Sequence, residues 1–111
     1  MILLAFATAV AASISPLEAL ADYAACVSTT AAEFKASDLS GDTAETVVRA
    51  AQVACRKDRQ TFVDAVDAFT RARHPELGPG SRAKVADLFV RAQEQNLERE
   101  VAGQIDGKGT N

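Results

Sequence analysis

The sequence predicts an all-α protein: a disulfide-stapled antiparallel helical hairpin with a third helix against it, forming a small three-helix bundle. Apolar residues recur at helical spacing through most of the chain, and no segment shows the strict alternation typical of a strand. Cys26 and Cys55 are equidistant from the midpoint between Ser40 and Gly41, which lie in a turn-forming segment. Together these observations predict two antiparallel helices linked by one disulfide.

The first predicted helix runs from about Asp22 to Ala36. One helical face carries residues at spacings of three or four, namely Tyr23, Val27, Thr30 and Phe34. Residues 37–43 (SDLSGDT) contain only residues common in turns apart from one leucine. Asp42, followed three residues later by Glu45, has the pattern of a capping box and predicts the start of a second helix.

The second predicted helix is the strongest element and extends to Arg73. Its apolar face comprises Val48, Ala51, Cys55, Phe62, Val66 and Phe69. Pro75 and the Gly-Pro-Gly sequence at 78–80 predict its end.

A third helix is predicted to begin after Ser81. Its early apolar face, predicted to pack on the second helix, consists of Val85, Leu88, Phe89 and Ala92. A second apolar set lies about 140° away around the axis and consists of Val90, Leu97, Val101 and Ile105. We expect this set either to form an exposed strip that docks a protein partner or a second copy, or to belong to a frayed end. Residues 106–111 are predicted to be a disordered tail.

The cysteines are predicted to form a disulfide, because residues equidistant from the turn lie at one level of an antiparallel hairpin. Closing this loop stabilises the fold by about 3.5 kcal/mol in the chain-entropy model. Two alternatives remain: buried free thiols in a cytoplasmic protein, or lipid anchoring through Cys26, which follows Tyr23-Ala24-Ala25 in a partial lipobox.

The leader predicts export. Residues 2–14 (ILLAFATAVAASI) carry no charge and have the length of a signal-peptide core, although no Lys or Arg precedes Lys35. Small residues favour cleavage after Ala21, giving a signal peptide 1–21 and a helical domain 22–105. Cleavage after Ser13 is the alternative. The predicted compartment is periplasmic or extracellular, or cytoplasmic if the leader is not a signal.

Composition argues against several partner classes. The chain has 12 Lys and Arg against 15 Asp and Glu, a net charge of −3, and therefore lacks the basic surplus of nucleic-acid or anionic-membrane binders. The apolar leader would rise only about 20 Å as a helix, so no stable membrane span is predicted after cleavage.

Candidate chemical sites are weak. Asp38, Ser40 and Asp42 have the spacing of the first ligands of a calcium loop, but Thr43 and Arg49 stand where glycine and an acid are required. His74 is the sole histidine, and no cofactor motif is present. Arg59 lies in the apolar face of the second helix and therefore needs a partner; the hairpin register predicts an ion pair with Asp22.

The predicted function is that of a non-enzymatic, exported protein-interaction or envelope structural module. The alternative is a carrier or sensor that binds a small apolar ligand between helices, which an apolar pocket would favour.

Overall fold

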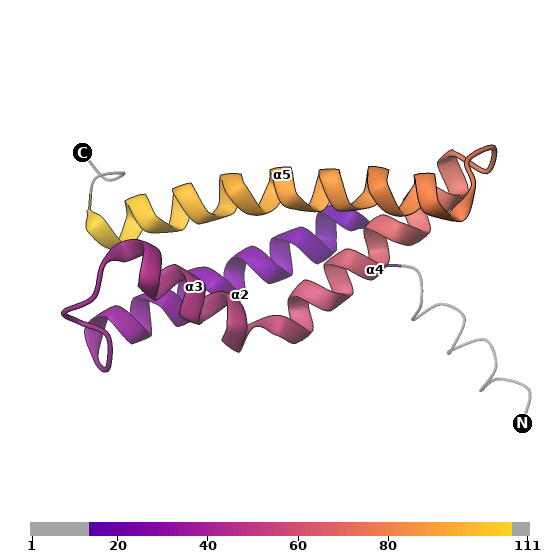
Figure 1. The fold of residues 1–111 in the computed structure, drawn as a ribbon. Helices are drawn as coiled ribbons and strands as arrows, with labels where there is room; N and C mark the ends of the chain where they lie inside the picture. Colours follow the sequence, from indigo (N-terminus) through magenta and orange to yellow (C-terminus); the bar gives the residue numbers. More distant parts are fainter. Residues whose placement is uncertain (1–13, 108–111) are drawn as a thin grey trace, which may run out of the picture.

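The computed structural model describes residues 14–107, which are all-helical (Figure 1). The helices are α2 (Pro16–Ala36), α3 (Ala44–Ala54), α4 (Arg56–Arg73) and α5 (Pro79–Asp106). Helix α2 runs antiparallel to α3 and α4, which follow one another almost end to end, and α5 lies along all three. The predicted small helical bundle is therefore confirmed. The apolar leader up to residue 13 and the last four residues of the predicted tail lie outside the described residues.

Helix α2 begins six residues earlier than predicted, within the segment assigned to the signal peptide. Ser15 caps it: the hydroxyl accepts a hydrogen bond from the Glu18 amide at 3.2 Å, and the Glu18 carboxylate accepts one from the Ser15 amide at 3.5 Å. Pro16 occupies the first helical position, where its fixed φ and missing N–H favour a helix start.

The turn between α2 and α3 is closed by Lys35. Its ammonium donates to the carbonyl oxygens of Ser40 at 3.1 Å and Asp42 at 2.9 Å. The cap of α3 is Thr43, whose hydroxyl accepts from the Thr46 amide at 3.2 Å. The predicted cap at Asp42 was therefore wrong by one residue.

The second predicted helix is interrupted at Cys55, which separates α3 from α4. The backbone there has φ −97° and ψ 25°, in the bridge region beside the helical one. Hydrogen bonds continue on either side, from the Cys55 amide to Ala51 and from the Arg59 amide to Cys55. The chain thus bends at the disulfide cysteine, and both α3 and α4 contact α2.

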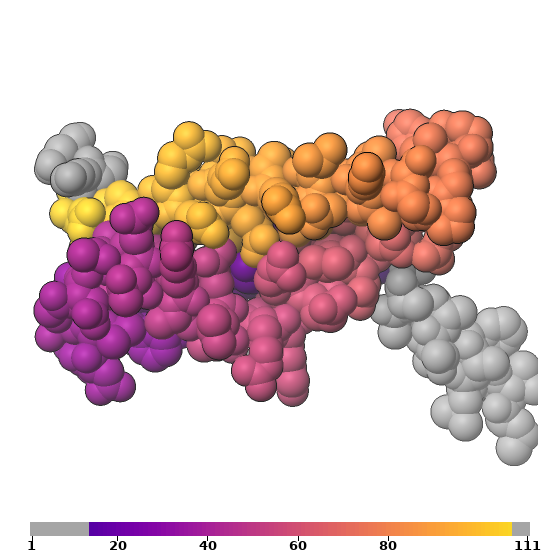
Figure 2. Space-filling model, in the orientation of Figure 1, coloured from indigo at the N-terminus to yellow at the C-terminus, as the bar shows by residue number. Residues whose placement is uncertain are grey.

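Helix α5 is the longest element and begins at Pro79, two residues before the predicted cap at Ser81. Its 28 residues correspond to about 42 Å of helix, enough to cover both α3 and α4 (Figure 2). Gly107 ends it with φ 77°, a left-handed conformation that favours glycine.

The predicted faces of α5 are reversed in the structure. Val90, Leu97 and Val101 are at most 5% exposed, and Ile105 packs against the core, so the predicted exposed strip is the buried face. The set predicted to face inward is instead exposed, with Leu88 the most open at 68%. The prediction of a docking strip at Val90, Leu97, Val101 and Ile105 is therefore wrong.

The core combines small and large side chains from all four helices. Tyr23, Val27, Val47, Val48, Phe62 and Val101 are its largest fully buried members. Phe62 lies at its centre, with ring centroids 6.3 Å from Tyr23 and 6.5 Å from Phe89. Alanines fill the remaining contacts and let the helices approach closely.

Candidate functional site

The predicted disulfide is confirmed. Cys26 and Cys55 are joined with their Cα atoms 6.1 Å apart, within the usual range for a disulfide. The Thr30 hydroxyl lies 3.6 Å from the Cys55 sulfur. Because the Cys26 sulfur is bonded in the middle of α2, it is not available for acylation, and lipid anchoring at this residue is incompatible with the structure.

Arg59 pairs with Glu94 of α5, and the predicted pair with Asp22 was wrong. The guanidinium donates twice to the carboxylate, from Nε to Oε2 at 2.7 Å and from Nη2 to Oε1 at 3.0 Å. Asp22 is exposed on α2. The prediction considered only the two helices of the hairpin, whereas the partner, Glu94, lies on α5.

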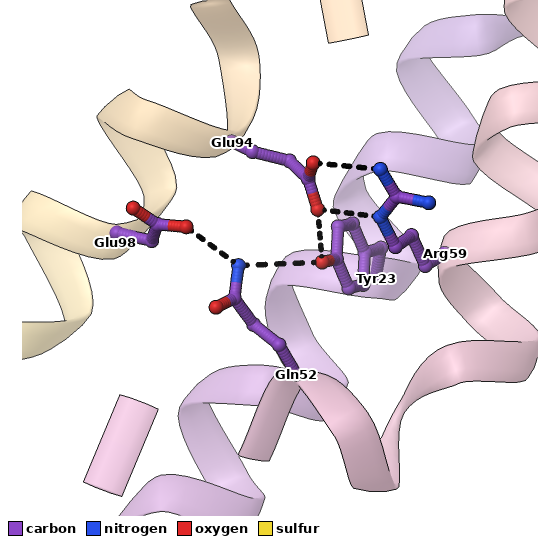
Figure 3. A network of polar contacts seen from close by, with 5 residues as sticks. All are labelled: Tyr23, Gln52, Arg59, Glu94 and Glu98. Carbon is purple, nitrogen blue, oxygen red and sulfur yellow. Dashed lines mark hydrogen bonds and ion pairs between the residues drawn. The ribbon is translucent and has the colours of Figure 1, made fainter. Parts of the chain in front are cut away.

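Glu94 is the centre of a polar network that joins the four helices of residues 14–107 (Figure 3). Its Oε2 accepts a hydrogen bond from the Tyr23 hydroxyl at 2.6 Å. The Gln52 amide of α3 donates to Glu98 at 3.1 Å and, at 3.5 Å, to the Tyr23 hydroxyl. Helices α2, α3 and α4 therefore each contribute one side chain that reaches toward the two acids of α5.

The network shifts the pKa values of Tyr23, Glu94 and Arg59. Burial, and then the hydrogen bond to Glu94, raise the pKa of Tyr23 well above its ordinary value of 10.0. Burial also raises the pKa of Glu94, but hydrogen bonds from Arg59 and Tyr23 outweigh it and hold this pKa below 4.5. The hydrogen bond to Glu94 raises the pKa of Arg59, although burial opposes it. At neutral pH Glu94 is thus a carboxylate, Arg59 a guanidinium and Tyr23 a neutral phenol.

This arrangement fixes helix positions. The Glu94 side chain is 13% exposed, and its carboxylate accepts hydrogen bonds from donors on two helices. Such a group specifies which face of α5 turns inward, as buried polar residues do in helical bundles. We therefore assign the network a structural role.

An apolar groove of about 380 Å³ opens where the start of α2, the end of α4 and the start of α5 meet. Its apolar walls are Leu17, Val66, Phe69, Val85 and Phe89. Its polar lining comes from Ser15, Thr70 and His74. We refer to this feature as the apolar groove.

Large apolar side chains remain open to solvent around this groove. Leu17 is 78% exposed, and Phe69, Val85 and Phe89 are each between 42% and 49% exposed. Leu88, one turn from Val85 on α5, adds to the same surface. Monomeric proteins rarely gather exposed apolar residues in one place unless the surface binds something.

Charged groups at the groove are few. The Arg73 guanidinium lies 5.2 Å from the centroid of the Phe69 ring, in cation–π contact. The His74 ring nitrogen Nδ1 lies 3.2 Å from the Glu76 carboxylate. A backbone hydrogen bond, and then the one to His74, lower the pKa of Glu76. Among residues 14–107 no carboxylate pairs with Arg73, so its charge beside Phe69 is not neutralised by an ion pair.

The sequence contained partial signals for these features. Ala86, Val90, Leu97 and Val101 form one stripe on α5, but Glu94 interrupts it in its middle and hides the pattern. The groove was missed because Leu17 was assigned to the signal peptide and Val85 and Phe89 were assigned to the core.

Within residues 14–107, no group of three or more His, Cys, Asp or Glu side chains is arranged to hold a metal ion. No helix in the same range has the length and apolar character needed to cross a membrane.

The chain matches no protein-family model, and comparison with curated proteins and with solved structures finds no significant similarity.

Proposed function

We propose that this protein is an exported, non-enzymatic binding module whose apolar groove receives apolar side chains of a partner protein. The observation that carries the proposal is the gathering of exposed Leu17, Phe69, Val85, Leu88 and Phe89 at one end of a small, alanine-rich bundle. Export is supported by the apolar leader and by the disulfide, which is typical of proteins in oxidising compartments.

The lining favours binding over catalysis. The walls are apolar, and the titratable group that lines the groove, His74, lies beside Glu76 at the surface. General acid–base or nucleophilic catalysis needs a positioned partner for such a group within an enclosed site.

The shape favours a protein as the occupant. Leu17, which lines the groove, and Leu88, which lies outside it, are 78% and 68% exposed, so most of each side chain remains in water. A small molecule would leave these side chains in water, whereas a partner surface would cover them together with the groove. The unpaired Arg73 guanidinium at the rim matches an acidic residue of the partner, so we infer an apolar segment flanked by Asp or Glu.

The test compares Leu17→Asp with Val53→Asp. Both residues are exposed and apolar, but Val53 lies on α3 and does not line the groove. Leu17 is the second residue of α2, where an acid is compatible with the helix dipole, so the fold should persist.

A photo-reactive phenylalanine analogue at position 17 should cross-link the partner in cells of the native host, and the same analogue at position 53 should not. The partner identified by mass spectrometry is then titrated against the purified variants. Leu17→Asp should weaken binding at least about tenfold, or roughly 1.4 kcal/mol, and Val53→Asp should leave it unchanged. Equal affinities, or an identified surface without an acid and apolar residues, would refute this proposal.

A small apolar ligand is the second candidate, favoured by the groove volume of about 380 Å³, within the range of ligand pockets. Native mass spectrometry of protein purified from its host would support it by showing a bound small molecule that Leu17→Asp loses and Val53→Asp retains.

A further inference from the structure

We propose that the leader is removed after Ser13, so that the mature protein begins at Ile14 rather than Asp22. This inference rests on the proposed export. The sequence Ala11-Ala12-Ser13 supplies small residues at the −3 and −1 positions of a signal-peptidase site, and the preceding residues 2–10 (ILLAFATAV) form an uncharged core of suitable length.

The start of α2 supports retention of residues 14–21. The Ser15 hydroxyl and the Glu18 carboxylate exchange hydrogen bonds with each other's backbone amides, and Pro16 occupies the first helical position. Reciprocal capping of this kind satisfies amides that the helix itself leaves unpaired. Cleavage after Ser13 preserves this complete start, with Ile14 and Ser15 preceding the helix.

Packing supports the same boundary. Ala19 is 1% exposed and belongs to the core, and Leu20 packs against it. Leu17 forms a wall of the apolar groove. Residues 17–20 are thus integrated into the folded domain, whereas a signal peptide is discarded.

Cleavage after Ala21 would remove the first six residues of α2. The new α-ammonium group would stand at a helix N-terminus, where a positive charge opposes the helix dipole. It would also adjoin Tyr23, which is fully buried and donates to Glu94. The residue that holds α2 in the polar network would then lie in a fraying first turn.

The test is the N-terminus of the protein produced with its own leader. The full 111-residue chain is expressed in a bacterium that has a periplasm, and the periplasmic protein is analysed by intact mass and N-terminal sequencing. We expect loss of residues 1–13 and a first residue of Ile14.

Two variants identify the site independently of folding. Ser13→Arg places a large cation at −1 and should leave most of the chain uncut. Ala21→Arg changes an exposed residue of α2, blocks only the competing site and should be processed like the wild type.

The proposed cleavage after Ser13 would be refuted, and export retained, by a mature chain that begins at Asp22. The same holds if processing is lost in Ala21→Arg but not in Ser13→Arg. Uncut wild-type chain confined to the cytoplasm would overturn both export and the site. Uncut chain in the periplasm would overturn the site alone.

Discussion

Arg59 of α4 and Glu94 of α5 form a bidentate ion pair. The Glu94 Oε2 atom accepts a hydrogen bond from Arg59 Nε at 2.7 Å and another from the Tyr23 hydroxyl at 2.6 Å. One carboxylate thereby contacts α2 and α4 from α5. The position of α5 in the bundle depends on this side chain as well as on apolar burial.

Replacing Glu94 should measure that dependence. Glu94→Gln removes the charge while leaving an acceptor for Tyr23, and we expect the free energy of unfolding to fall by about 1–2 kcal/mol. This is below the roughly 3–5 kcal/mol typical of a broken buried pair, because the Arg59 side chain is 42% exposed and can reach water. Urea denaturation measures the change.

Asp67→Asn is the matched control. Asp67 pairs with Arg71 at the same 2.7 Å, but the two side chains are 43% and 61% exposed. The expected loss is below about 0.5 kcal/mol. Equal losses for the two variants would contradict a special role for Glu94.

The pH dependence of stability should carry the signature of the network. Folding lowers the pKa of Glu94. Its contribution to the free energy of unfolding is therefore complete above pH 4.5, the ordinary pKa, and is lost as the pH falls below that value. Folding raises the pKa of Tyr23. Its contribution to the free energy of unfolding is therefore complete below pH 10.0, the ordinary pKa, and is lost as the pH rises above that value.

Chemical denaturation at a series of pH values should therefore show that the wild type has a higher free energy of unfolding than Glu94→Gln, and that this difference shrinks below pH 4.5. The difference in free energy of unfolding between the wild type and Tyr23→Phe should shrink above pH 10.0. Differences that stay constant across both ranges would show that these groups titrate alike in the folded and unfolded chains.

The orientation of α5 can be tested with two leucines. Leu97 is 5% exposed and Leu88 is 68% exposed. Leu97→Ala should cost about 2–4 kcal/mol through lost burial and a new cavity, whereas Leu88→Ala should cost less than about 0.5 kcal/mol. The opposite order, measured by thermal or urea unfolding, would mean that α5 presents its other face to the core.

Removal of the disulfide should destabilise the protein without changing its helices. For a sequence separation of 29 residues, the Cys26→Ala, Cys55→Ala double variant should lose about 3.5 kcal/mol. The far-UV circular dichroism of the folded variant should match the wild type. A loss below about 1 kcal/mol would indicate that the unfolded chain is already compact without the bond.

Much of the hairpin could be predicted from sequence because its signals are local. The turn-rich segment at residues 37–43 fixes the centre, and the positions of Cys26 and Cys55 fix the register. Helical periodicity identifies the fold class. The bend at Cys55 had no such signal, since no proline or glycine marks it.

The errors arose where a polar residue occupies a core-facing position. Glu94 interrupts the inward stripe of α5, and only the three-dimensional arrangement shows that Arg59 and Tyr23 satisfy it. The start of α2 was misplaced for a different reason: Leu17 to Ala21 fit both the end of a signal peptide and a capped helix, and only the contacts of Ser15 and Ala19 show that these residues are helical.

The covalent connection between Cys26 and Cys55 encloses the turn at residues 37–43, most of which is exposed. Exposed turns are preferred sites of proteolytic nicking. A cut there would leave two fragments still joined through the sulfur bridge, at an effective concentration that keeps their helices in register. A nicked molecule should therefore retain the bundle and the apolar groove, which lies at the opposite end.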